Sequence, residues 1–149
     1  MSMYNRILMA LDFHSDNKEI IEKGSSLARA NKADLYLVHV NEPLTVAYAG
    51  NGMAWSDQIV SLEASIREES EKKMKDLAGQ LKVKEDRCFI REGRPSSEIH
   101  QLAEENDIDV IVIGTHGQSG FKLLLGSTAN SVLHGAPCDV LAVRIGDND

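Results

Sequence analysis

The sequence has little cysteine, no long apolar stretch and no excess of positive charge, and each shortage excludes a class of protein. Cys88 and Cys138 are the only cysteines, so we expect two reduced cytosolic thiols and no disulfide framework. The apolar stretch at residues 7–11 is interrupted by Asp12 and His14, so it is too short to cross a membrane, and it lacks the small-residue cleavage site of an export signal. With 16 Lys and Arg against 23 Asp and Glu, the net charge is −7, which leaves no basic field for nucleic acid or an anionic membrane.

The length and composition predict one ordinary domain. A chain of 149 residues with 42% apolar side chains can bury roughly 70% of its unfolded surface without disulfides. We therefore expect a single domain over residues 1–149 with a polar tail at 146–149. The expected location is the cytoplasm, with no nucleic-acid or membrane partner.

Five short apolar runs predict the strands of a sheet. None alternates cleanly between apolar and polar residues, and continuous runs of this kind are typical of parallel strands covered by helices on both faces. The four stronger runs are residues 7–11, 35–40, 110–113 and 140–143. A weaker run at residues 87–91 is flanked by arginines, which indicates an edge strand.

Helical patterns fill the gaps between these runs. Asp16 and Glu19 predict a capped start for the first helix, Pro95 fits the first turn of the third, and Gly135 before Pro137 predicts the end of the last. The expected buried faces are Ile20, Gly24, Leu27 and Ala28; Ile59, Leu62, Ile66, Met74, Leu77 and Leu81; Ile99, Leu102 and Ala103; and Ala129, Val132, Leu133 and Ala136. Alternating strands and helices predict an α/β fold, a doubly wound parallel sheet with helices on both faces.

One long connection, residues 41–56, stands out between these elements. A connection of this length is either functional or disordered. Its apolar side chains favour docking on the rest of the domain, on a ligand or on a second subunit.

The predicted topology also indicates where a ligand would bind. In open α/β sheets, ligands bind beyond the carboxyl ends of the strands, where the winding direction reverses. If the strands at residues 7–11 and 110–113 are central neighbours, residues 10–15 and the stretch that begins at Gly114 border that crevice.

A glycine-rich segment follows the 110–113 strand and ends at a predicted helix. Gly114, Gly117 and Gly120 leave the backbone free to approach a ligand closely. Gly126-Ser127-Thr128 opens the last helix, where free amide N–H groups and two hydroxyls predict an anion site suited to phosphate. The P-loop is excluded because Ser127 and not Lys follows Gly126, and no glycine follows the first strand as a dinucleotide fingerprint requires. A plain glycine-rich turn is the alternative.

Ordered motifs along nearly the whole chain resemble those of the universal stress protein family. These motifs are Ile7-Leu8-Met9-Ala10-Leu11-Asp12, Val38-His39-Val40, Gly93-Arg94-Pro95 with Glu98-Ile99, residues 109–117, Gly126-Ser127-Thr128-Ala129, and residues 136–143. The resemblance implies a five-stranded parallel sheet in the order 3-2-1-4-5 and a homodimer. The implied dimer interface is the last strand, here Val140, Leu141, Ala142, Val143 and Arg144.

Some members of the family bind ATP or a related adenine nucleotide such as AMP, with or without Mg²⁺. Carried over to this chain, the resemblance implies that Asp12 holds the ribose hydroxyls and that the backbone at Val40 and Ile113 contacts adenine. Gly114 and Gly117 would let the chain pass the phosphates. The remaining implied nucleotide-binding residues are Ala10, His116, Gly126, Ser127 and Thr128.

The sequence departs from the nucleotide-binding pattern in one spacing. Eight residues separate Gly117 from Gly126, where the binding members have nine, and this shorter loop resembles the branch of universal stress protein A. Three functions therefore stay open: a nucleotide-binding, homodimeric regulator of the stress response, a dimeric interaction module with an unidentified protein partner, and a slow ATPase.

Individual residues also have alternative interpretations. Asp12 is either a ribose ligand or a cap for the following helix, and His116 either binds phosphate or faces solvent. Both cysteines are interpreted as small core residues. The histidines lack the spacing of a metal site, and no nucleophile, base and orienting acid occur together, so we predict neither metal nor catalytic residues.

Overall fold

A computed structural model describes residues 2–44, 57–115 and 126–145 of the chain. In chain order, the elements are β1 (Arg6–Leu11), α1 (Lys18–Asn31), β2 (Asp34–Asn41), α3 (Asp57–Leu81), the 3₁₀ turn η2 (Glu85–Arg87), β3 (Cys88–Glu92), α4 (Pro95–Glu105), β4 (Val110–Gly114), α5 (Ser127–Leu133) and β5 (Asp139–Val143). The long connection at residues 41–56 lies mostly outside the described residues.

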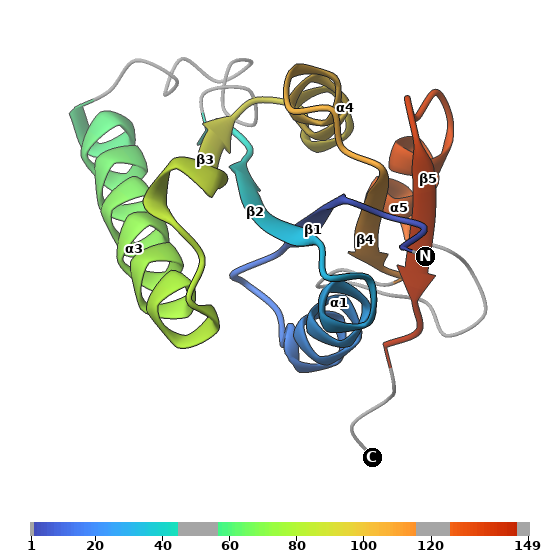
Figure 1. Cartoon of the computed structure of the whole chain (residues 1–149). Coiled ribbons are helices and arrows are strands. Elements are labelled where there is room, and N and C mark those ends of the chain that lie inside the picture. Colours follow the sequence, from blue (N-terminus) through green and yellow to red (C-terminus); the bar gives the residue numbers. More distant parts are fainter. Residues whose placement is uncertain (1, 45–56, 116–125, 146–149) are drawn as a thin grey trace.

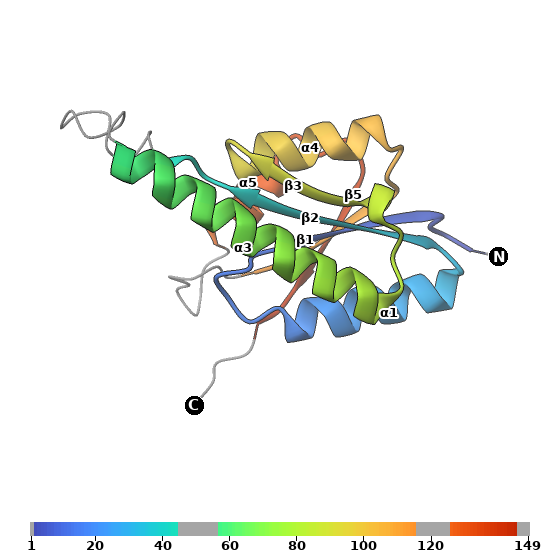
Figure 2. The same ribbon diagram turned by 90° about the vertical axis from the view of Figure 1, so that its left-hand side faces the viewer.

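The five strands form one parallel sheet in the order β3-β2-β1-β4-β5, which confirms the predicted topology. Three layers result (Figures 1 and 2): α1 and α3 cover one face of the sheet, and α4 and α5 cover the other. The edge position predicted for residues 87–91 is also confirmed, although Arg87 belongs to η2 and not to β3.

The two faces of the sheet carry two separate hydrophobic cores. Leu8, Val38 and Ile111 pack beneath α4 and α5, whereas Met9 and Leu37, on the opposite face, pack beneath α1 and α3. Since successive side chains of a strand point to opposite faces, a strand covered on both sides must be apolar at every position. This requirement explains the continuous apolar runs in the sequence.

The helix α1 begins at Lys18. The predicted cap, Asp16 paired with Glu19, requires a helix that begins one residue earlier. Asn17 occupies the N-cap position, and its carbonyl accepts the first helical hydrogen bond, from Ile21 N–H (2.9 Å). Asp16 lies one residue earlier, but its Oδ1 accepts the N–H of Lys18 at 2.9 Å and so satisfies one amide of the first turn. The predicted cap is therefore wrong in position.

Two predicted apolar faces contain errors. Leu62 on α3 is 48% exposed although Ile59, one turn earlier, is buried, and the buried face includes Ser70 instead. Leu133 on α5 is 50% exposed, and Ala136 lies beyond the end of that helix. On α4, the predicted stripe and Pro95 in the first turn are confirmed.

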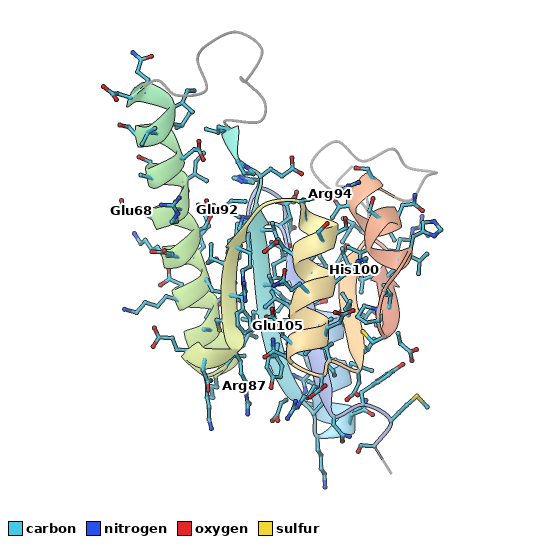
Figure 3. All side chains as sticks on the ribbon, turned by 90° about the horizontal axis from the view of Figure 1, so that it is seen from above. Glu68, Arg87, Glu92, Arg94, His100 and Glu105 are labelled. Atoms are coloured by element: carbon cyan, nitrogen blue, oxygen red, sulfur yellow. The ribbon has the colours of Figure 1, made fainter. Side chains whose placement is uncertain are left out.

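Polar contacts tie the helices to their neighbours. Glu92 at the end of β3 points to α3 (Figure 3), where its Oε1 accepts a hydrogen bond from Arg67 Nε at 2.6 Å. On the other face, His100 of α4 points to α5, and its Nε2 lies 2.7 Å from the carbonyl oxygen of Val132. The interpretation of both cysteines as core residues is confirmed only in part. Each is half-buried and packs against the margin of a core, Cys138 beneath α4 and α5 and Cys88 beneath α1 and α3.

Candidate functional site

A gap opens between β1 and β4 at the carboxyl edge of the sheet. The β1–β4 ladder ends where Met9 lies opposite Val112. The β1–β2 ladder continues to Leu11, and the β4–β5 ladder continues to Gly114. The two central strands therefore separate while each still follows its outer neighbour, and the strand order reverses at this point. A crevice at such a reversal is the usual ligand site of an open α/β sheet.

Three predicted binding residues lie on the strands that reach this edge. Ala10 and Ile113 are both buried with side chains in the core beneath α4 and α5, and half-buried Val40 packs against the same core. They come from β1, β4 and β2, so the structure brings them to one face of the sheet. Their side chains are occupied by packing, which leaves the backbone as the part that a ligand would contact.

Asp12 follows β1 directly and is half-buried. Its Oδ1 accepts the N–H of His14 (3.0 Å), its Oδ2 accepts the hydroxyl of Ser15 (3.1 Å), and its carbonyl accepts the N–H of Ser15 (3.0 Å). These bonds form a turn of the type that Asp favours. The carboxylate therefore stabilises the turn before α1, which is close to the alternative interpretation of Asp12 as a cap. Each oxygen still has a lone pair for a further donor.

Asn17 is a residue of this segment that the sequence analysis missed. Its Oδ1 accepts the N–H of Asp12 at 3.0 Å, and its Nδ2 donates to the carbonyls of Asp12 (2.8 Å) and Ser15 (3.2 Å). One side-chain amide thus binds both backbone groups of Asp12. An Asn shortly after a strand and directly before a helix is a usable sequence signal for such a turn.

Thr115 connects three parts of the opposite side of the crevice. Its N–H donates to Val143 O (2.9 Å), its Oγ1 accepts the N–H of Ile145 (3.3 Å), and its carbonyl accepts the N–H of Gly126 (2.6 Å). The residues on either side of the undescribed stretch 116–125 are therefore joined by one short backbone bond. The predicted site residues His116 and Gly117 lie outside the described residues.

Gly114 is required by packing. A Cβ at this position would lie 3.0 Å from Ile20 Cδ1 and 3.1 Å from Ile145 Cδ1. Both distances are tighter than ordinary contacts, so any side chain would displace α1 or the end of the chain after β5. The structure therefore explains the glycine at position 114 by packing and not by the backbone freedom that the sequence analysis expected.

The start of α5 offers fewer free donors than predicted. Gly126 is the N-cap residue, with φ −58° and ψ 154°, and its N–H is bound by Thr115. The first helical bond runs from Asn130 N–H to Gly126 O (2.9 Å), so the amides of Ser127 and Thr128 precede the helical ladder. Both of these residues are exposed, and their amides and hydroxyls can accept an anion.

A shallow groove of about 540 Å³ lies beside the Asp12 turn, between α1 and α3. Its floor includes Phe13, Ile21 and Leu77, and Lys73 at its rim donates from Nζ to Phe13 O at 3.1 Å. The sequence did not predict this groove, because it forms between helices that are far apart along the chain.

The predicted interface strand β5 lies at the edge of the sheet. Leu141 (39% exposed), Ala142 and Arg144 are exposed, Val140 is half-buried, and Val143 is buried. At its amino end, Tyr4 donates its hydroxyl proton to Asp139 Oδ2 (2.9 Å), and this hydrogen bond is the main reason why the pKa of Tyr4 is raised. Burial, and then the carboxylate of Asp139, raise the pKa of the Cys138 thiol to about 11.

Within residues 2–44, 57–115 and 126–145, no group of three or more His, Cys, Asp or Glu side chains is placed to hold a metal ion. No helix in this same part of the chain combines the length and apolar character needed to cross a membrane.

The fold and this edge define a class: a doubly wound α/β protein whose two central strands stop pairing at the reversal point of its sheet. A model described as the universal stress protein family matches residues 3–144, and the chain belongs to that family. Universal stress protein A homolog 2 of Coxiella burnetii is 42% identical over 147 residues, which cover 97% of this chain and 98% of the relative.

Solved structures share the fold. The structure of protein MJ0577, a universal stress protein of Methanocaldococcus jannaschii, superposes with a TM-score of 0.79 and 25% identity, and covers 98% of this chain and 99% of that one. A universal stress protein described as in complex with cAMP superposes with a TM-score of 0.57 and 24% identity over 96% of this chain and 98% of that one. The second likeness shows the fold alone.

Proposed function

We propose that this chain is a single-domain cytoplasmic regulator of the stress response that binds an adenine nucleotide, ATP or AMP, between β1 and β4. The observation that carries the proposal is the early end of the β1–β4 ladder at Met9 and Val112, beyond which both strands continue. The fold itself is compatible with such a ligand, because a protein of this fold is described as in complex with cAMP.

Each part of the nucleotide has a chemically suitable group near this edge. The carboxylate of Asp12 would accept the ribose hydroxyls, and the backbone at Val40 and Ile113 would contact adenine. The amides and hydroxyls of Ser127 and Thr128 would bind the phosphates, with Mg²⁺ entering only as a partner of those phosphates. Gly114 would let the chain pass the phosphates, and its lack of a side chain also suits the packing of Ile20 and Ile145 against it.

Two experiments test nucleotide binding. Freshly purified protein is denatured, and any released small molecule is identified by mass spectrometry. AMP and ATP are then titrated by calorimetry into the wild-type protein, Asp12→Ala and the control Asp86→Ala, which removes the same charge at the exposed turn before β3. Loss of hydrogen bonds to a carboxylate costs about 1.5–3 kcal/mol, so Asp12→Ala should bind at least about tenfold more weakly and Asp86→Ala unchanged. A wild-type protein that binds neither nucleotide would refute the proposal.

A second candidate is a dimeric interaction module without nucleotide. Three observations favour it: the Asp12 carboxylate already accepts two hydrogen bonds, the N–H of Gly126 is bound by Thr115, and the loop has eight residues between Gly117 and Gly126. Stoichiometric nucleotide released on denaturation would rule this candidate out.

A further inference from the structure

His39 is buried at the end of β2 and contacts both residues that flank Asp12. Its side chain is 2% exposed. Its Nδ1 lies 3.3 Å from Phe13 N and 3.1 Å from Leu11 O. Its ring packs against the ring of Phe13, with centroids 4.6 Å apart, and forms an edge-to-face contact with the ring of His14, with centroids 5.8 Å apart. The imidazole therefore packs against the turn that contains Asp12.

The other ring nitrogen of His39 is fixed in turn. Its Nε2 lies 2.8 Å from Asn41 Oδ1, an oxygen that also accepts the hydroxyl of Ser70 at 3.2 Å. Since this oxygen is an acceptor, Nε2 carries the proton, and Nδ1 is left to accept the N–H of Phe13. A chain of hydrogen bonds thus runs from α3 through β2 to the end of β1.

Asp12 is consequently held from two directions. The side chain of Asn17 binds its N–H and carbonyl, and His39 Nδ1 accepts the N–H of Phe13, the next residue in the chain. A binding carboxylate must be held to within about 0.5 Å of its working position by groups that are themselves fixed by packing and hydrogen bonds. A buried, doubly bonded imidazole meets that requirement.

We propose that His39 is a positioning residue of the nucleotide site, which orients Asp12 for the ribose through its hydrogen bond to Phe13 without contacting the ligand. This inference rests on the proposed function, because Asp12 needs a precise position only if it binds a ligand.

Two isosteric substitutions separate positioning from mere structural support. The side-chain amide of Asn reaches the place of the imidazole Nδ1, and that of Gln reaches the place of Nε2. His39→Asn therefore keeps the contact to the end of β1 and loses Asn41, whereas His39→Gln does the reverse. Affinity for AMP is measured by calorimetry, and the free energy of unfolding by urea denaturation.

We expect both variants to be less stable but only one to bind poorly. His39→Asn should bind AMP within about threefold of the wild type, and His39→Gln about tenfold or more below it. A structural role would weaken both variants alike, so equal affinities, or the opposite order, would overturn the proposal. The control His100→Gln alters the imidazole bonded to Val132 on the other face and should leave AMP affinity unchanged.

A cycle with Asp12→Asn tests whether His39 acts through Asp12. If it does, His39→Gln should cost less affinity in the Asp12→Asn background than in the wild type, and equal losses in both would contradict the proposal. Should the His39 variants fail to fold, Asn41→Ala removes the partner of Nε2 and keeps the bond between Nδ1 and Phe13. Its affinity for AMP should then stay within about threefold of the wild type, as for His39→Asn, and a loss of about tenfold or more overturns the proposal. If the wild type binds neither AMP nor ATP, the proposed function and this inference are overturned together. If the wild type binds and the His39 variants bind equally well, this inference alone is overturned.

Discussion

At the scale of single residues, two glycines show opposite relations to their surroundings. A Cβ on Gly114 would press on Ile20 and Ile145, whereas a Cβ on Gly79 of α3 would meet nothing within 4 Å. Glycine in a helix interior costs stability relative to Ala because more backbone freedom is lost on folding. Gly114 is therefore needed for packing, while Gly79 is only tolerated.

We predict opposite changes in stability at these two positions. Gly114→Val should lower the free energy of unfolding by about 1–3 kcal/mol through overpacking. Gly79→Ala should raise it by about 0.5–1 kcal/mol, since Ala favours the helix and fits the open space. Urea denaturation of both variants measures the changes, and a Gly114→Val protein as stable as the wild type would contradict the packing role.

A second prediction at this scale concerns Cys138. A thiol whose pKa rises from 9.0 to about 11 holds roughly a hundredfold less thiolate near pH 8. Iodoacetamide should therefore alkylate Cys138 in the folded protein far more slowly than in protein unfolded by urea. The sign of the shift also means that its stabilising effect is complete below pH 9 and is lost as the pH rises through 11. Equal alkylation rates in the folded and unfolded protein would count against the buried, acidic surroundings of this thiol.

The role of His39 could not be predicted from the sequence, unlike that of Asn17, whose partners are local. His39 lies inside an apolar run, and the sequence alone does not show whether a histidine at such a position is hydrogen-bonded in the core. Leu11 at the end of β1 and Phe13 in the turn after it are far from His39 in the sequence, and the fold alone brings them to its ring. The position of Asp12 directly after β1 was predictable, because the end of a strand is a local feature of the sequence.

At the scale of the elements, strands were easier to predict than helix faces. A strand covered on both faces is recognised by composition alone, and β1, β2, β4 and β5 were placed to within one or two residues. A helix face depends on where the helix extends relative to the sheet, which no local pattern contains. Leu62 and Leu133 fit the helical period, yet both are exposed.

The edge strand β5 carries a prediction about assembly. A parallel edge strand with exposed Leu141 and Ala142 is a surface that a second copy can cover. Leu141→Arg should convert a dimer to monomers in sedimentation velocity without loss of helical content. The control Leu62→Arg alters another exposed leucine, which is 48% exposed on α3, and should leave the assembly unchanged. A wild-type protein that sediments as a monomer would refute the proposed homodimer.

At the scale of the whole molecule, ligand binding and folding are linked. A ligand that binds only the folded state at a hundred times its Kd adds about 2.7 kcal/mol of stability. For a chain of this size, that gain should raise the Tm by roughly 5–10 °C. Thermal unfolding with saturating AMP should show this rise in the wild type and not in Asp12→Ala. An equal rise in both proteins would place the nucleotide away from Asp12.

A backbone hydrogen bond joins Thr115 to Gly126. Because of this bond, the stability of the sheet depends little on how many residues lie between them. Adding one residue to a ten-residue segment whose ends are already joined changes its closure entropy by only about 0.1 kcal/mol. By closure entropy alone, a change of one residue in this length leaves the stability of the sheet almost unchanged, so under the proposed function its effect would fall on the ligand. Ligand preference within this architecture can thus diverge between related chains while the scaffold beneath stays the same.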